Sequence, residues 1–169
     1  MTGRTLARML MFAGALTAPA AGAAGAPKTA KQVEVGAGVV QATNAVRAKH
    51  GLPRLRPVRT LARAATRHST YLATTGEFRH EDAAGRPFWA RIIKAGYPRN
   101  ATMAENIAQT AGCGPASVAQ AMRMWMNSAP HRANILNPKL RAIGVGAVAN
   151  ADCTEVYFTV DFGSSTRGR

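Results

Sequence analysis

The chain has 169 residues and a formal net charge of +14 at pH 7, with 22 lysines and arginines against 8 acidic residues. We expect a chain of this length to form one domain, with enough residues for a real hydrophobic core. The charge has two interpretations: an anionic partner, such as a surface polymer, lipid headgroups or nucleic acid, or the arginine-rich codon usage of a GC-rich genome.

The first 26 residues are typical of a secretory signal peptide. Arg4 and Arg8 supply a positively charged start, residues 9–16 are apolar, and residues 18–26 are small, with several Ala-x-Ala cleavage options. A transmembrane anchor is the alternative, but the stretch is short, rich in alanine and glycine, and interrupted by Pro19. Removal of the two arginines takes the formal charge from +14 to +12.

We therefore expect a secreted protein, either periplasmic or extracellular, that meets the membrane only through its signal peptide. It is predicted to be a monomer without specific nucleic-acid binding. The predicted segments are a signal peptide at residues 1–26, a flexible mature N-terminus at 27–37, a folded domain at 38–164 and a C-terminal tail at 165–169.

The two cysteines, Cys113 and Cys153, leave only one possible intramolecular disulfide. Export brings a protein into an oxidising compartment, and both cysteines lie in predicted surface loops, which favours the bond. It would close a loop of roughly 40 residues and stabilise the fold by ~4 kcal/mol in the chain-entropy model. Two free thiols are the alternative.

Two helices are predicted in the first half of the chain. Apolar residues recur at helical spacing from Val39, and Gly51 followed by Pro53 ends this helix. Pro57 opens the second helix, a favoured early position for proline. His68 lies on its apolar face and is expected to be a packed, hydrogen-bonded core residue.

The opposite face of the second helix carries Arg59, Arg63 and Arg67 at positions i, i+4 and i+8. Like charges at this spacing destabilise an isolated helix by roughly 0.2–0.5 kcal/mol per pair. A bound anion would relieve the repulsion, and so would ordinary solvation of the side chains.

Two further helices and three strands follow. A short helix is predicted over residues 86–96, and another from Pro115 to a break at residues 128–130. A polar turn at residues 150–154 joins the last two strands as an antiparallel hairpin, and an excess of helices over strands predicts an α+β domain. The predicted strands are residues 104–109, 142–149 and 155–162.

Four short motifs carry a family resemblance. They are Phe78-Arg79-His80, Ala104-Glu105-Asn106-Ile107, the stretch WMNSAPHRANIL from Trp125 to Leu136, and Ile143-Gly144-Val145-Gly146. Over residues 39–163 the chain resembles the CAP superfamily of cysteine-rich secretory, antigen 5 and pathogenesis-related proteins, and above all its compact bacterial secreted branch. The resemblance implies an α-β-α sandwich with helices on both faces of a small, mainly antiparallel sheet.

The resemblance also implies a cleft with two histidines and two acids, which is the family's metal-binding or candidate catalytic site. His80 matches the first histidine, Glu105 the first acid and His131 the second histidine. The family's Trp-x-x-Glu pattern appears here as Trp125-Met126-Asn127-Ser128, so Ser128 stands where the second acid is expected. The sequence therefore supplies three of the four groups that a mechanism using the full set would require.

The remaining three groups still suit metal chemistry. Two neutral imidazoles, His80 and His131, are good ligands for zinc or another divalent metal. Glu105 could be a third ligand, orient one imidazole, or act as a base for a metal-bound water. Alternatively, the polar set simply forms hydrogen bonds across the cleft. No organic cofactor is expected.

Other polar residues have structural interpretations. Ser128 and His131 are three positions apart, as a nucleophile and its base could be, but Pro130 is expected to break any helix that would align them. Asn106 points to the opposite strand face from Glu105 and is expected to be a structural hydrogen-bonding residue. Asn134 is interpreted as a loop or cap residue.

The leading functional hypothesis is a secreted protein that acts by binding. The resemblance implies lipid, sterol, anionic surface polymer or protein partners, next to a cleft able to bind metal. Replacement of the second acid by Ser128 favours binding over catalysis. The alternatives are a protease- or esterase-like metal-dependent hydrolase using His80, His131 and Glu105, and a cationic envelope-binding or antimicrobial factor with a vestigial cleft.

Overall fold

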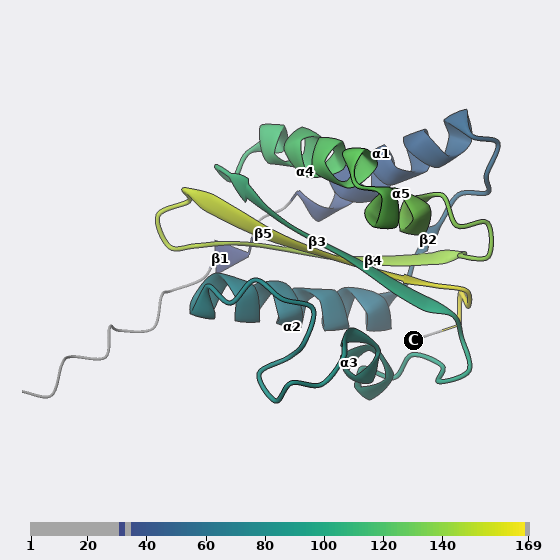
Figure 1. Ribbon diagram of the computed structural model, residues 1–169, viewed down its shortest axis with the longest axis horizontal. Coiled ribbons are helices and arrows are strands. Elements are labelled where there is room, and N and C mark those ends of the chain that lie inside the picture. The colour runs from purple at the N-terminus through teal and green to yellow at the C-terminus, as the bar shows by residue number, and fades with distance from the viewer. Residues whose placement is uncertain (1–30, 33–34, 168–169) are drawn as a thin grey trace, which may run out of the picture.

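The centre of the computed structural model is a twisted sheet (Figure 1). Its strands follow the order β1-β4-β5-β3, with β2 paired in parallel to β4 and all other pairs antiparallel. This arrangement leaves β3 at an edge of the sheet. The strands are β1 (Lys31–Gln32), β2 (Arg56–Pro57), β3 (Met103–Ala111), β4 (Ala142–Ala149) and β5 (Glu155–Gly163).

Helices cover both faces of the sheet, so the predicted α-β-α sandwich is confirmed (Figure 1). Helices α2 (Arg59–Thr75) and α3 (Phe88–Lys94) lie on one face. The opposite face is covered by α1 (Gly36–Lys49), α4 (Pro115–Asn127) and α5 (Ala129–Ile135).

The structure describes residues 31–32 and 35–167. The predicted signal peptide lies outside these residues, as does most of the predicted flexible N-terminus. Within the described ranges, none of the helices has the length and apolar character needed to cross a membrane.

The predicted hairpin is confirmed, with β4 and β5 in register from Ala142 opposite Gly163 to Ala149 opposite Val156. The predicted start of the second helix is wrong by two residues. Pro57 belongs to β2, and the Val58 N–H donates to the Ile143 carbonyl at 2.9 Å, so pairing with β4 holds this segment extended until Arg59.

The predicted end of the fourth helix at residues 128–130 is confirmed, because α4 stops at Asn127, but the chain turns there directly into a further helix that was not predicted. Ser128 ends α4 and precedes α5, whose first turn contains Pro130. A proline is tolerated in a first turn because its missing N–H has no intrahelical partner there. His131 therefore lies in the first turn of α5.

Helix α2 packs on the sheet at two glycines of β4. A Cβ atom added to Gly144 would overlap the backbone of Leu61 and Ala62, and one added to Gly146 would lie 2.5 Å from the Ala65 carbonyl carbon. The backbone of α2 thus lies directly on β4, which explains the Gly-x-Gly pattern of this strand.

Trp125 anchors the other layer. Its side chain is fully buried, meets Phe158 edge to face, and donates from Nε1 to the Ile107 carbonyl at 2.9 Å. The predicted disulfide between Cys113 and Cys153 is confirmed, with Cα atoms 5.4 Å apart. It joins the segment between β3 and α4 to the turn of the β4–β5 hairpin.

A buried arginine holds the segment that follows α5. Arg47 is fully buried and donates to the carbonyls of Ile135, Asn137 and Leu140, with distances from 2.8 to 3.3 Å, and to that of Pro53 at 2.9 Å. Side-chain donors to successive carbonyls fix the path of a chain that has no ladder partner. Arg47 therefore sets where α5 ends and β4 begins.

Candidate functional site

A cleft of about 570 Å³ lies at the edge of the sheet, beside the first residues of β3. It receives side chains from both layers, and the predicted residues His80, Glu105 and His131 all line it. Phe88, Met103, Ala104, Pro130 and Asn134 complete the lining.

Glu105 holds the imidazole of His80. The carboxylate is buried, and its Oε1 lies 2.7 Å from His80 Nδ1. A carboxylate oxygen accepts, so Nδ1 must carry the proton and donate. In the neutral ring, the lone pair is then on Nε2. Glu105 therefore fixes both the tautomer and the orientation of a half-exposed histidine.

Arg91 of α3 is a member of the site that the sequence did not single out. One of its terminal nitrogens forms an ion pair with Glu105 Oε2, and the other donates to the His80 carbonyl at 2.8 Å. Burial lowers the pKa of Arg91. The guanidinium thus contacts both partners of the His80–Glu105 pair.

Asp161 of β5 is paired with Glu105 of β3 in the sheet register, so the two side chains lie beside each other on one face. Asp161 is fully buried, its Oδ1 is 3.9 Å from Arg91, and neither of its oxygens has a hydrogen-bond donor among the described residues. Burial raises the pKa of Asp161 to about 7, although the charges of Arg91 and His80 lower it. One guanidinium therefore faces two carboxyl groups.

His131 is held by Ser128, which corrects the expectation that Pro130 would keep the two apart. Its Nδ1 lies 2.8 Å from Ser128 Oγ. The two residues stand immediately before α5 and at its third position, and a helical first turn brings such side chains together. Ser128 is not among the residues that line the cleft, and its hydroxyl contacts the Nδ1 side of the imidazole.

Two asparagines attach α5 to the edge of β3. Asn106 is fully buried and donates to the His131 carbonyl at 3.1 Å, which agrees with its expected structural role. Asn134 donates to Asn106 Oδ1 at 2.9 Å and to the Glu105 carbonyl at 3.1 Å. Asn134 is therefore a helical cleft residue, and its interpretation as a loop or cap residue was wrong.

Both cleft histidines are biased toward their neutral forms. Burial, and then the charge of Arg91, lower the pKa of His80. Burial, and then the charge of His80, lower the pKa of His131. Neutral imidazoles can accept a hydrogen bond or bind a metal.

His68 contacts the loop that carries His80. It is buried as expected, stacks on Tyr71, and its Nε2 lies 2.9 Å from the Arg79 carbonyl, the residue before His80. Burial, and then the charge of Arg91, lower the pKa of His68 to about 4. The neutral ring donates to that carbonyl and fixes the loop that carries His80.

Among residues 35–167, no three histidine, cysteine, aspartate or glutamate side chains are arranged as a metal-binding group. This result does not favour Glu105 as a third ligand. Glu105 already uses one oxygen for His80 and the other for Arg91.

The chain has recognisable relatives among known proteins. The model of the cysteine-rich secretory protein (CAP) family matches residues 40–162. The protein YkwD of Bacillus subtilis is 38% identical over 111 residues, which are 65% of this chain and 41% of YkwD. The chain thus spans about two fifths of the length of this relative.

Two solved structures are similar. An extracellular protein of Bacillus anthracis that contains an SCP domain has 25% identity and a TM-score of 0.63, covering 75% of this chain and 39% of the other. An outer surface protein of Borrelia burgdorferi has 20% identity and a TM-score of 0.65, covering 80% of this chain and 98% of the other. At 20% identity, the second likeness shows the fold alone.

Proposed function

We propose, given that this chain belongs to the cysteine-rich secretory protein (CAP) family, that it is a secreted protein whose cleft binds a divalent metal through His80 and His131. The protein acts by holding a ligand at this cleft and not by hydrolysis. The B. anthracis relative is an extracellular protein, which supports secretion.

The observation that carries the metal proposal is the hydrogen bond from His80 Nδ1 to Glu105. Carboxylates that accept from the far nitrogen of a metal-binding histidine orient the ring and raise its basicity. Ser128 Oγ can accept from His131 Nδ1 in the same way. Neither Nε2 has a hydrogen-bond partner in the described part of the chain, so both remain available.

The donor set fits zinc or a similar ion, because imidazole nitrogen is a preferred ligand and both rings favour the neutral form that binding requires. His80 and His131 would hold the ion. When bound, the metal supplies a positive centre that attracts an anionic or carbonyl group of a ligand. Phe88 and Met103 give the cleft an apolar wall for the rest of that ligand.

The roles of Glu105 and Arg91 support binding over hydrolysis. A general base must be accessible to the water that it activates and lie within hydrogen-bond reach of it. Glu105 is buried, and each of its oxygens already contacts a partner, His80 or Arg91. Ser128 contacts the Nδ1 side of His131 and is outside the cleft lining, so it does not supply a nucleophile to a bound ligand.

The metal proposal predicts that the double change His80→Ala and His131→Ala abolishes zinc binding measured by titration calorimetry. His50→Ala is the matched control, because His50 is exposed, bonds only to the Val46 carbonyl within its own helix, and is absent from the cleft lining. The control should bind zinc as the unchanged protein does. Stoichiometric zinc binding by the double variant, with an unchanged circular dichroism spectrum, would overturn the assignment.

The binding role predicts no metal-dependent turnover. Peptide and ester substrates should be hydrolysed at the same background rate with added zinc and with a chelator. The His80→Ala, His131→Ala variant distinguishes turnover at the cleft from turnover by contaminating enzymes. Turnover that a chelator removes, and that this variant lacks, would replace the binding role with hydrolysis while leaving the metal site intact.

A further inference from the structure

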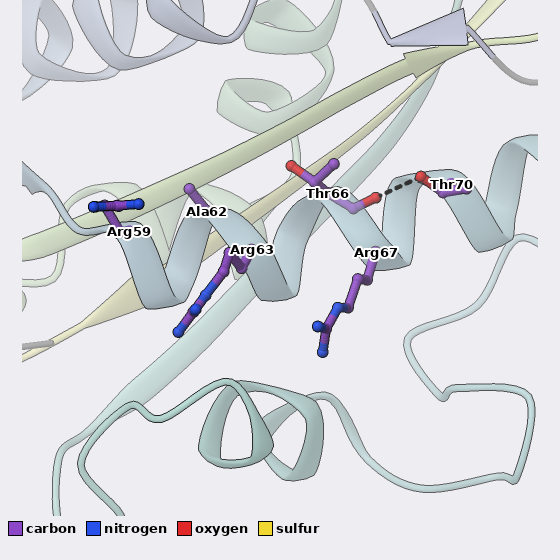
Figure 2. A pocket seen from close by; sticks show the side chains of 6 residues that line it. All are labelled: Arg59, Ala62, Arg63, Thr66, Arg67 and Thr70. Carbon is purple, nitrogen blue, oxygen red and sulfur yellow. Dashed lines mark hydrogen bonds between the residues drawn. The ribbon is translucent and has the colours of Figure 1, made fainter. Parts of the chain in front are cut away.

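Helix α2 presents a row of arginines on the side away from the sheet. Arg59, Arg63 and Arg67 all lie on its solvent-facing side, and the first turn of the helix contains no acidic residue. Figure 2 shows Arg63 and Arg67 extending from the same side of the helix. The three arginines line a shallow hollow of about 550 Å³ together with Ala62, Thr66 and Thr70.

These arginines have no carboxylate counter-ion among the described residues, where every ion pair uses Arg79, His80, Arg86 or Arg91. Like charges one helical turn apart repel each other. Arg63 also donates from one terminal nitrogen to the Ala95 carbonyl at 2.7 Å. This bond holds its guanidinium on the surface, which reduces the entropy lost when an anion binds.

The hollow has a regular geometry. Successive arginines are about 6 Å apart along the helix axis, because each residue rises about 1.5 Å. Ala62, Thr66 and Thr70 form a second row at the same spacing, and the Thr70 hydroxyl donates to the Thr66 carbonyl at 2.9 Å. Small side chains beside a row of guanidinium groups leave room for an extended chain.

The composition of the hollow argues against insertion into a lipid bilayer. Helices that lie in a membrane interface bury Trp, Phe or Leu side chains between the lipids. The large apolar residues of α2, Leu61 and Leu72, are fully buried within the domain. The hollow itself offers only charged and small side chains.

We infer that the exposed face of α2 is a docking surface for a linear polyanion, whose repeated phosphate or carboxylate groups pair with Arg59, Arg63 and Arg67. Guanidinium groups form forked hydrogen bonds with both kinds of oxyanion. The surface consists of α2 side chains alone and shares no lining residue with the His80–His131 cleft. It therefore does not depend on the function proposed for that cleft.

The test compares two triple variants with the same net charge. One replaces Arg59, Arg63 and Arg67 with glutamine, and the control replaces Arg54, Arg99 and Arg123, which are exposed arginines outside α2. Binding to a fluorescent oligodeoxythymidylate, as the phosphate polymer, and to labelled poly-glutamate, as the carboxylate polymer, is measured by anisotropy at increasing salt.

The α2 triple variant should lose at least about tenfold in affinity, and the control triple less than about twofold. Each lost phosphate contact should reduce the slope of log affinity against log salt by about 0.7, so the α2 triple should lose about 2 from this slope. Binding of only one polymer would identify the anionic group. Equal losses in both triples would show a general charge effect and overturn the proposal, as would no binding of either polymer.

Two further measurements test whether a folding defect or lipid binding explains the loss of affinity. Arg59→Gln with Arg67→Gln retains the Arg63–Ala95 hydrogen bond, and it should still lose most of the affinity with an unchanged melting temperature. Vesicles of phosphatidylglycerol and phosphatidylcholine test the membrane. Vesicle binding that needs the α2 arginines, without binding to either polymer, would assign this face to lipid and overturn the polymer proposal.

Discussion

Gly144→Ala is expected to lower the free energy of unfolding by about 3 kcal/mol or more. The added methyl group would overlap the backbone of Leu61 and Ala62 in α2, and backbone atoms cannot rotate out of the way as a side chain can. Overpacking of this kind costs roughly 1–3 kcal/mol when side chains can adjust, and more when a helix must move. Urea unfolding followed by circular dichroism measures the change.

Gly38→Ala is the matched control. A Cβ atom on Gly38 would lie 3.5 Å from Val118 Cγ2, an ordinary contact, and the residue belongs to α1. Alanine should therefore stabilise the domain by roughly 0.5–1 kcal/mol, the usual difference from glycine within a helix. A loss below about 1 kcal/mol for Gly144→Ala would mean that α2 does not lie directly on β4.

A second large effect is expected in the pH dependence of stability, because folding shifts the pKa values of two buried groups in opposite directions. The pKa of His68 falls from 6.5 to about 4 on folding, which corresponds to about 3 kcal/mol. This stability is fully present above pH 6.5 and is lost as the pH falls toward 4. The pKa of Asp161 rises from 3.8 to about 7. Its contribution is fully present below pH 3.8, and about 4 kcal/mol is lost as the pH rises to 8.

Each contribution can be isolated by a residue that does not titrate. Asp161→Asn should gain about 4 kcal/mol relative to the unchanged protein between pH 4 and pH 8. His68→Gln, whose amide can still donate to the Arg79 carbonyl, should lose about 3 kcal/mol relative to it between pH 4 and pH 6.5. Unfolding free energies at half-unit steps of pH give both curves. Parallel curves for all three proteins would refute the assigned titrations.

Most of the fold could be predicted from local patterns. The β4–β5 hairpin was predicted within a residue, because two mostly apolar runs on both sides of a polar turn have one simple explanation. The join between α4 and α5 was missed, because a Ser-Ala-Pro sequence can end one helix and begin another. The choice between a simple helix end and a new helix depends on how residues 129–135 pack on the edge of β3. No local sequence pattern predicts that packing.

The candidate site was predicted only in part. His80, Glu105 and His131 were expected from family motifs, and the structure places all three at one cleft. Arg91 was missed because nothing in a short basic segment distinguishes it from the exposed arginines nearby. Asp161 had a local signal, an acidic residue within an otherwise apolar strand, but its place opposite Glu105 depends on a strand register that is set only in the folded sheet.

The pleat of β3 has a consequence for misfolding. Glu105 and Asn106 are consecutive in β3 but point to opposite faces. Glu105 contacts Arg91 and His80, whereas Asn106 donates to the His131 carbonyl. A slip of one residue against β5 would exchange their faces, turning the amide toward Arg91 and the carboxylate toward α5. The two histidines therefore become neighbours in only one alignment of the sheet. The Cys113–Cys153 bond, which joins the far ends of the same strands, favours that alignment, so oxidation before the sheet has formed would help to select a correctly assembled cleft.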